Sequence, residues 1–108
     1  MHPEIEDILK NCDPESAFPT ADAVINAERI LRYIDDINIE RTGKFEYTAA
    51  ESLYIPWMVE DMEFHIECLK TGRILYTFRK DGYYKAFGSD AIDQFIPRLE
   101  SYLLAGMC

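Results

Sequence analysis

The sequence contains few of the residues that mark most chemical sites. Among its 108 residues are three cysteines, two histidines, five glycines and one tryptophan. The cysteines, Cys12, Cys68 and Cys108, are widely spaced and form no C-x-x-C pair, which argues against a zinc site and a disulfide framework. The sequence also lacks a G-x-S-x-G motif and a glycine-rich phosphate loop. We therefore expect a non-enzymatic protein with no catalytic residue, no cofactor and no metal ion.

Long hydrophobic runs are missing as well. No segment approaches the roughly 18 apolar residues that a membrane helix requires. The N-terminal segment MHPEIEDILK is acidic, whereas a secretory signal begins with basic residues and continues with apolar ones. The sequence therefore predicts a cytoplasmic protein without a membrane-spanning segment.

Positive charge is scarce, and the formal net charge is −9. Residues 1–40 hold ten acidic and three basic side chains, residues 41–88 hold seven of each, and residues 89–108 hold three and one. Direct binding to nucleic acid is disfavoured, because phosphate groups require a basic surface. An acidic protein can instead bind the basic surface of a nucleic-acid-binding protein by imitating nucleic acid, although acidity can also serve solubility alone.

Apolar side chains are plentiful, at 48% of the residues, and aromatic ones make up 13%. A chain of this size and composition can bury one hydrophobic core, so residues 1–108 are expected to form a single domain. The residue patterns predict an α+β two-layer domain, with helices packed on one face of an antiparallel β-meander of three to five strands. The expected elements are an N-terminal helix and loop over 1–19, a helix over 20–36, the sheet over 37–87 and a helix over 89–104.

Local signals place the helix ends. Pro3 suits the first turn of the N-terminal helix, and Thr20 suits the N-cap of the second helix. The last helix is expected to begin at Ser89, in a motif that resembles a capping box. Pro97 lies inside this helix and removes a backbone hydrogen bond, so we expect a kink there or a break into two helices.

The middle of the chain is harder to assign. Short strands are expected at Ile37–Arg41 and Lys44–Thr48, and a further strand at Leu53–Met58. Pro56 has no N–H to donate, which predicts that this last strand lies at an edge of the sheet or is bulged.

Alternation of apolar and polar residues predicts three further strands, beginning at Met62, Ile74 and Tyr83. A three-residue loop at Lys70–Gly72 pairs Cys68 with Ile74 and thereby places all the apolar side chains on one face. By the same argument, a three-residue loop at Lys80–Gly82 is expected to pair Arg79 with Tyr83.

Several segments resemble those of a family of small uncharacterised bacterial α+β domains, which occur near toxin–antitoxin and defence genes. The resemblance covers about residues 20–104. Relative to that family, this chain departs in having Pro56 and an added helix at residues 3–10. The resemblance implies an antitoxin, immunity or anti-defence role, and it implies no catalytic residue. The matching segments are Leu53–Trp57, Met62–Glu67, Gly72–Tyr76 and Ser89–Leu103.

Two surfaces are candidates for binding a partner. The first is an acidic face on the helices, and the second is the outer face of the sheet, where apolar, aromatic and basic side chains alternate with the core residues. Aromatic residues and arginine are typical of interface centres. The acidic candidates are Glu4, Asp7, Asp35 and Asp36. The candidates on the sheet are Arg73, Leu75, Arg79, Tyr83, Lys85 and Phe87.

These observations favour a protein-binding module, and specifically an inhibitor that covers a functional surface of its partner. Two alternatives remain open. The chain can be a small homodimeric accessory protein, or it can be a ligand-binding or enzymatic domain with a pocket between helix and sheet near Tyr54 and Trp57. The outer face can also be covered by the helix at residues 3–10.

Overall fold

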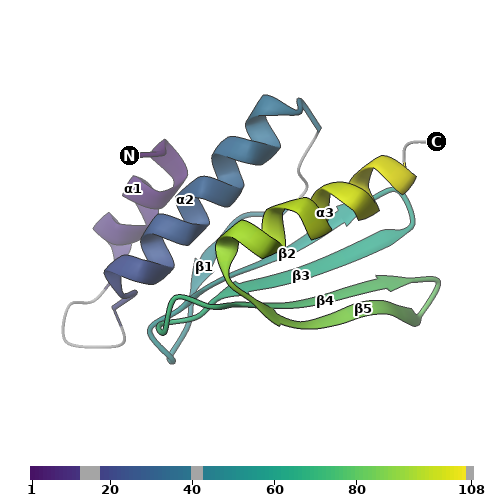
Figure 1. The fold of residues 1–108 in the computed structure, drawn as a ribbon. Helices are drawn as coiled ribbons and strands as arrows, with labels where there is room; N and C mark the ends of the chain where they lie inside the picture. Colours follow the sequence, from purple (N-terminus) through teal and green to yellow (C-terminus); the bar gives the residue numbers. More distant parts are fainter. Residues whose placement is uncertain (13–17, 40–42, 107–108) are drawn as a thin grey trace.

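The structure is a computed structural model that describes residues 1–12, 18–39 and 43–106 (Figure 1). It is an α+β domain of two layers, in which α2 and α3 lie side by side on one face of a five-stranded antiparallel sheet. The strands follow one another in sequence order, so the sheet is a meander, and the predicted fold class is confirmed. The elements are α1 (Pro3–Asn11), α2 (Ala21–Asp36), β1 (Glu46–Tyr47), β2 (Leu53–Val59), β3 (Met62–Cys68), β4 (Ile74–Lys80), β5 (Tyr83–Asp90) and α3 (Ile92–Gly106).

The first two helices begin at the predicted caps. The backbone N–H of Glu4 donates to Nδ1 of His2, and Pro3 occupies the first turn of α1. The backbone N–H of Ala23 donates to Oγ1 of Thr20 at the start of α2. Each cap satisfies a backbone donor that has no partner within its helix.

The β3–β4 hairpin has the predicted register. Cys68 pairs with Ile74, and the backbone N–H of Leu69 donates to the carbonyl of Arg73, so Lys70–Gly72 is a three-residue loop. Gly72 has a φ of 92°, a left-handed conformation that favours glycine. The buried amide of Asn26 donates to the carbonyl of Gly72 over 2.9 Å, which ties α2 to this loop.

The predicted register of the β4–β5 hairpin is wrong. Lys80 pairs with Tyr83, which leaves a two-residue turn at Asp81 and Gly82. Their φ values of 53° and 82° are both positive, as in the type I′ turn that Asp-Gly sequences favour. An irregularity next to Arg79 then restores the pattern of buried residues further along the strand.

The start of the last helix also differs from the prediction. β5 continues through Ser89 to Asp90, and the helix begins only at Ile92, so the expected cap at Ser89 is wrong. The backbone N–H of Phe95 donates to the carbonyl of Ala91 in its first turn. Pro97 lies within one continuous helix, so the predicted break into two helices is wrong.

Between α2 and β2 the chain forms less strand than expected. Ile37 caps α2 and Asn38 lies in a turn, so neither belongs to a strand. The end of the strand expected at Ile37–Arg41 falls in residues 40–42, which are outside the described residues. Of the strand expected at Lys44–Thr48, only Glu46–Tyr47 is formed. This strand pairs with Leu53 and Tyr54 alone and does not reach Pro56. β2 nevertheless lies between β1 and β3 and pairs with β3 without a register shift, so the predicted edge position or bulge is wrong.

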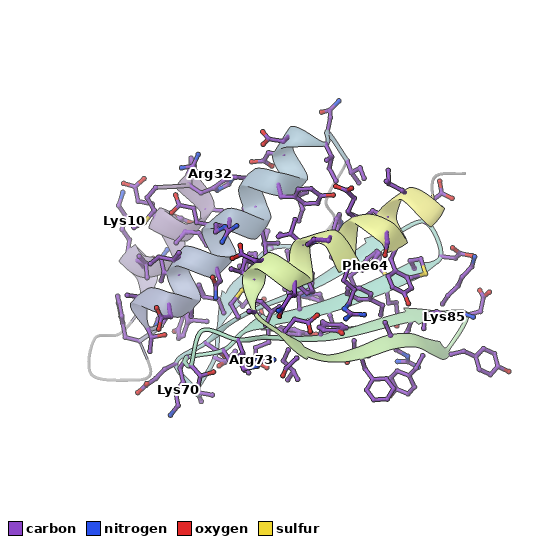
Figure 2. All side chains as sticks on the ribbon, viewed as in Figure 1. Lys10, Arg32, Phe64, Lys70, Arg73 and Lys85 are labelled. Atoms are coloured by element: carbon purple, nitrogen blue, oxygen red, sulfur yellow. The ribbon has the colours of Figure 1, made fainter. Side chains whose placement is uncertain are left out.

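The core lies between the sheet and the helices. Figure 2 shows Phe64 on the side of the sheet that α3 covers. Its ring centroid lies 5.2 Å from that of Trp57 and 4.9 Å from that of Phe78, its two cross-strand neighbours. α2 and α3 close this face, and α1 packs against α2 (Figure 1). The alternative in which the helix at residues 3–10 covers the opposite face is therefore wrong, and no described helix lies on that face.

Candidate interaction surface

The face of the sheet opposite the helices is called the outer face below. It is organised in rows that run across the strands from β2 to β5. Residues in a row are direct cross-strand neighbours, so their side chains lie within contact distance of one another. The three rows are Met58, Glu63, Arg79 and Tyr84; Pro56, His65, Thr77 and Phe87; and Tyr54, Glu67, Leu75 and Ser89.

The centre of the first row holds a pair of opposite charges. An oxygen of Glu63 lies 3.7 Å from a guanidinium nitrogen of Arg79 and 3.8 Å from Nε2 of His65. The guanidinium of Arg79 also lies over the ring of Tyr84, 5.3 Å from its centroid. Nε of Arg79 is buried and has no hydrogen-bond partner among the described residues. Glu63 and Arg79 thus form a cross-strand ion pair at the centre of the row.

Two hydrogen bonds fix the side chains at the β2–β3 side. The Tyr54 hydroxyl lies 2.6 Å from Nδ1 of His65, and the buried Ser52 hydroxyl donates to Glu67 over 2.6 Å. Burial, with added repulsion from nearby carboxylates, raises the pKa of Tyr54, so its hydroxyl stays protonated at neutral pH. The hollow beside these groups has a volume of about 120 Å³, which holds a few water molecules rather than a typical substrate.

The β5 side of the outer face is apolar. The exposed fractions are 73% for Phe87, 65% for Tyr84 and 44% for Leu75. The rings of Tyr84 and Phe87 meet edge to face with centroids 6.1 Å apart, and together with Thr77 they line a depression of about 330 Å³. A group of large apolar side chains that contact one another and are exposed to solvent is typical of surfaces that bind another molecule.

The structure brings four of the six predicted sheet residues to this surface. Leu75, Arg79 and Phe87 lie in the rows, and Arg73 is anchored beside them by donating to Oγ and the carbonyl of Ser89. Figure 2 shows Arg73 and Lys70 at one end of the strands and Lys85 at the other.

Tyr83 and Lys85 are placed differently from the prediction. Tyr83 pairs with Lys80, outside the outer rows, and Lys85 is the extra residue at the β5 irregularity. Tyr84 is the contributor that the predicted register missed. The Asp81-Gly82 dipeptide is the signal that predicts this arrangement, because it favours a two-residue turn.

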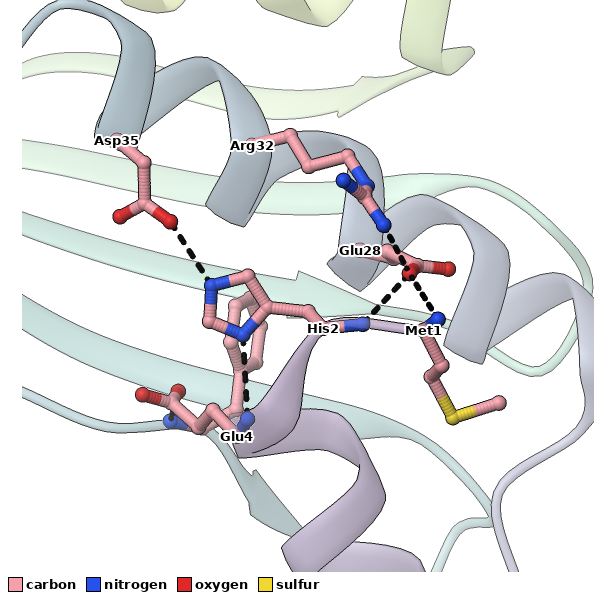
Figure 3. A network of polar contacts seen from close by, with 7 residues as sticks. Met1, His2, Glu4, Glu28, Arg32 and Asp35 are labelled. Carbon is pink, nitrogen blue, oxygen red and sulfur yellow. Dashed lines mark hydrogen bonds and ion pairs between the residues drawn. The ribbon is translucent and has the colours of Figure 1, made fainter.

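The predicted acidic surface is partly occupied by contacts within the chain. Figure 3 shows Asp35 accepting from Nε2 of His2 over 2.9 Å. The backbone N–H of Glu4 donates to the same imidazole. A carboxylate oxygen of Glu4 accepts a hydrogen bond from the backbone N–H of Phe45. These two carboxylates therefore hold α1 in place. Asp36 and Asp7 lie nearby on the exposed faces of α2 and α1.

Glu28 is the centre of the same network (Figure 3). Its carboxylate accepts from Arg32 over 2.9 Å and from the backbone N–H of His2 over 2.7 Å. These hydrogen bonds, that of Arg32 foremost, lower the pKa of Glu28. The pairing of Glu28 with Arg32, four residues apart on α2, thus extends to the start of α1.

The geometry bears on the other chemistries that the sequence raised. Cys68 is fully buried on the helix side of β3, whereas His65 lies on the outer face, and burial raises the pKa of the Cys68 thiol. Cys108 lies outside the described residues. Trp57 is 1% exposed on the inner face and Tyr54 lies on the outer face, so these two residues do not line one pocket. The described residues contain no cluster of His, Cys, Asp or Glu that could hold a metal ion.

No family model, no curated protein and no solved structure matches the chain. The resemblance to small bacterial domains near toxin–antitoxin genes therefore stays a prediction. In the part of the chain that the structure describes, no helix has both the length and the apolar character needed to span a membrane.

Proposed function

We propose that this chain is a non-enzymatic protein-binding module that acts in the cytoplasm, and that it inhibits a partner by covering it with the outer face. The observation that supports this most directly is the exposure of Phe87, Tyr84 and Leu75 on one flat surface. Exposing large apolar groups costs free energy that a bound protein surface would recover. Arginine and aromatic side chains in contact, as at Arg79 and Tyr84, are typical of interface centres.

A protein fits this surface better than a small molecule does. The hollows are shallow, at about 120 Å³ and 330 Å³, and they lie on a broad sheet instead of between elements. Small-molecule sites generally enclose most of their ligand. A net charge of −9 likewise disfavours nucleic acid as the occupant. An antitoxin, immunity or anti-defence role remains a prediction that specifies such a partner further.

The proposal is tested by comparing two substitutions on β5 and β4 with a matched control. The variant Leu75→Asp/Phe87→Asp places charge on the outer face, whereas Tyr83→Asp changes a side chain that is also 73% exposed but lies outside the outer rows. Partners that co-purify with the wild-type chain from its native cells are expected to be lost with the double variant and kept with Tyr83→Asp. Circular dichroism is expected to be the same for all three chains. Retention of every partner by the folded double variant would contradict the proposal.

A further inference from the structure

The outer face has a pattern of side chains that is complementary to itself. Apolar residues occupy its two margins, with Pro56 and Met58 on β2 and Tyr84 and Phe87 on β5. Pro56 is exposed, and Met58 is 42% exposed. Opposite charges occupy its centre, where β3 and β4 meet. In the first two rows this order reads alike from either margin, with Glu63 and Arg79 exchanging places, whereas the third row does not, because Glu67 and Leu75 occupy its centre.

We propose that the outer face binds a second copy of this chain, with two sheets stacked about a twofold axis that runs parallel to the strands, midway between β3 and β4. This inference rests on the proposed function in that it assigns an occupant to the same surface. A twofold interface requires each surface to complement itself, which is the property that the first two rows possess.

The rows determine which side chains meet across this axis. β3 of one copy faces β4 of the other, so Glu63 lies opposite Arg79 of the second copy, and the reverse contact occurs as well. β2 faces β5, so Met58 lies opposite Tyr84 and Pro56 opposite Phe87. Twisted sheets stack at about 30° to each other, which shifts the outer rows by about half the spacing between them. At the margins the side chains of one copy therefore lie between the rows of the other, so the two apolar margins meet as bands and not residue by residue.

Charge also favours a second copy. Most of the acidic excess lies in residues 1–40, which include α1 and α2 on the far side of the sheet. The sheet segment, residues 41–88, has equal numbers of acidic and basic side chains. Stacking the outer faces thus keeps the acidic helices of the two copies apart.

The size of the surface predicts the strength of the association. Four strands of seven residues give a flat area of about 440 Å² per copy, from strand spacings of about 4.8 Å and a rise of about 3.3 Å per residue. Stable interfaces generally bury about 800 Å² per partner. We therefore expect a reversible dimer with a dissociation constant in the micromolar range. Such a dimer would protect the outer face and yield to a partner that binds it more tightly.

The test reverses the charge of each of the two residues, Glu63 and Arg79, that face each other across the axis. Arg79→Glu gives a chain with two carboxylates at the centre of the outer face, and Glu63→Arg gives a chain with two guanidinium groups. By sedimentation velocity over a range of concentrations, the wild type is expected to dimerise, and each variant alone is expected to dimerise about tenfold or more weakly, because like charges meet twice. An equimolar mixture of the two variants is expected to dimerise again, because opposite charges then meet at both contacts.

Lys80→Glu is the matched control, since it changes the net charge by the same amount as Arg79→Glu but lies in the row of Tyr83. It is expected to leave the wild-type association unchanged. A monomeric wild type, or a mixture that stays monomeric, would overturn the self-association. If the wild type is monomeric but Leu75→Asp/Phe87→Asp still removes a heterologous partner, only the self-association is overturned and the proposed function stands.

Discussion

At the scale of single residues, the chain uses polar side chains to fasten elements that meet through small areas. α1 is only nine residues long, and Ile5 is its one fully buried side chain. Its position on α2 depends on the carboxylate of Glu28 and the imidazole of His2 (Figure 3). A short helix of this kind is marginal alone, so such contacts determine whether it stays docked.

Glu28→Gln is expected to lower the free energy of unfolding at neutral pH. The folded state lowers the pKa of Glu28 below its ordinary value of 4.5, so this contribution is full above pH 4.5 and is lost as the pH falls through the folded pKa. Urea unfolding of both chains at several pH values measures the difference, which should shrink toward zero in acid. A difference that is constant from neutral to acidic pH would contradict the assignment.

Gly88 is constrained by its cross-strand neighbour. Its φ is 152°, and an added Cβ would lie 3.2 Å from the hydroxyl oxygen of Tyr76. Gly88→Ala is therefore expected to lower the free energy of unfolding by about 1–3 kcal/mol. In a Tyr76→Phe background the loss should be smaller, because the contacting oxygen is absent. An equal loss in both backgrounds, measured as a double-mutant cycle, would assign the whole effect to backbone strain.

At the scale of elements, the sequence predicts one hairpin correctly and misplaces the other, for a physical reason. In β3 and β4 apolar and polar residues alternate cleanly, so only one register buries every apolar side chain. β5 begins with two exposed tyrosines and contains an irregularity, so burial does not fix its register, and the Asp81-Gly82 turn does. Tyr84 consequently replaces Tyr83 on the candidate surface.

The starts of the helices likewise divide into one that the sequence predicts and one that it does not. Caps that depend on neighbouring residues, such as Thr20, are predictable, because the interaction is local. The start of α3 is not, because Ser89 and Asp90 are taken by pairing with β4, which depends on residues far away in the chain. The outer face itself follows from the strand pattern, whereas its lack of a covering helix depends on where α1 packs.

Pro97 tests how α3 tolerates a missing hydrogen bond. The residue is exposed, and its nitrogen cannot donate to the carbonyl of Asp93, four residues earlier. Pro97→Ala restores this donor without disturbing the core, so it is expected to raise the free energy of unfolding by about 1–3 kcal/mol. Gln94→Ala, at another exposed position of α3, should change it by less than about 0.5 kcal/mol. A destabilised Pro97→Ala chain would show that the proline shapes the packing of α3.

At the scale of the whole molecule, the fold divides the chain into two sides with different character. The helices carry nine acidic against four basic side chains and close the core, whereas the sheet segment, with equal numbers of both, exposes aromatic groups on its outer face. A two-layer domain needs only one face of its sheet for its own core. The other face stays exposed, and we propose that a further protein chain binds it.

Site-specific photocrosslinking tests this claim most directly. A photoreactive amino acid at position 87 samples the outer face, and the same group at position 83 samples an equally exposed site outside the rows. In native cells, we expect strong protein adducts from position 87 and few from position 83. An adduct of twice the 12.6 kDa chain mass indicates a second copy, and any other mass indicates a heterologous partner. Equal or absent adducts at the two positions would contradict the claim that the outer face is a protein interface.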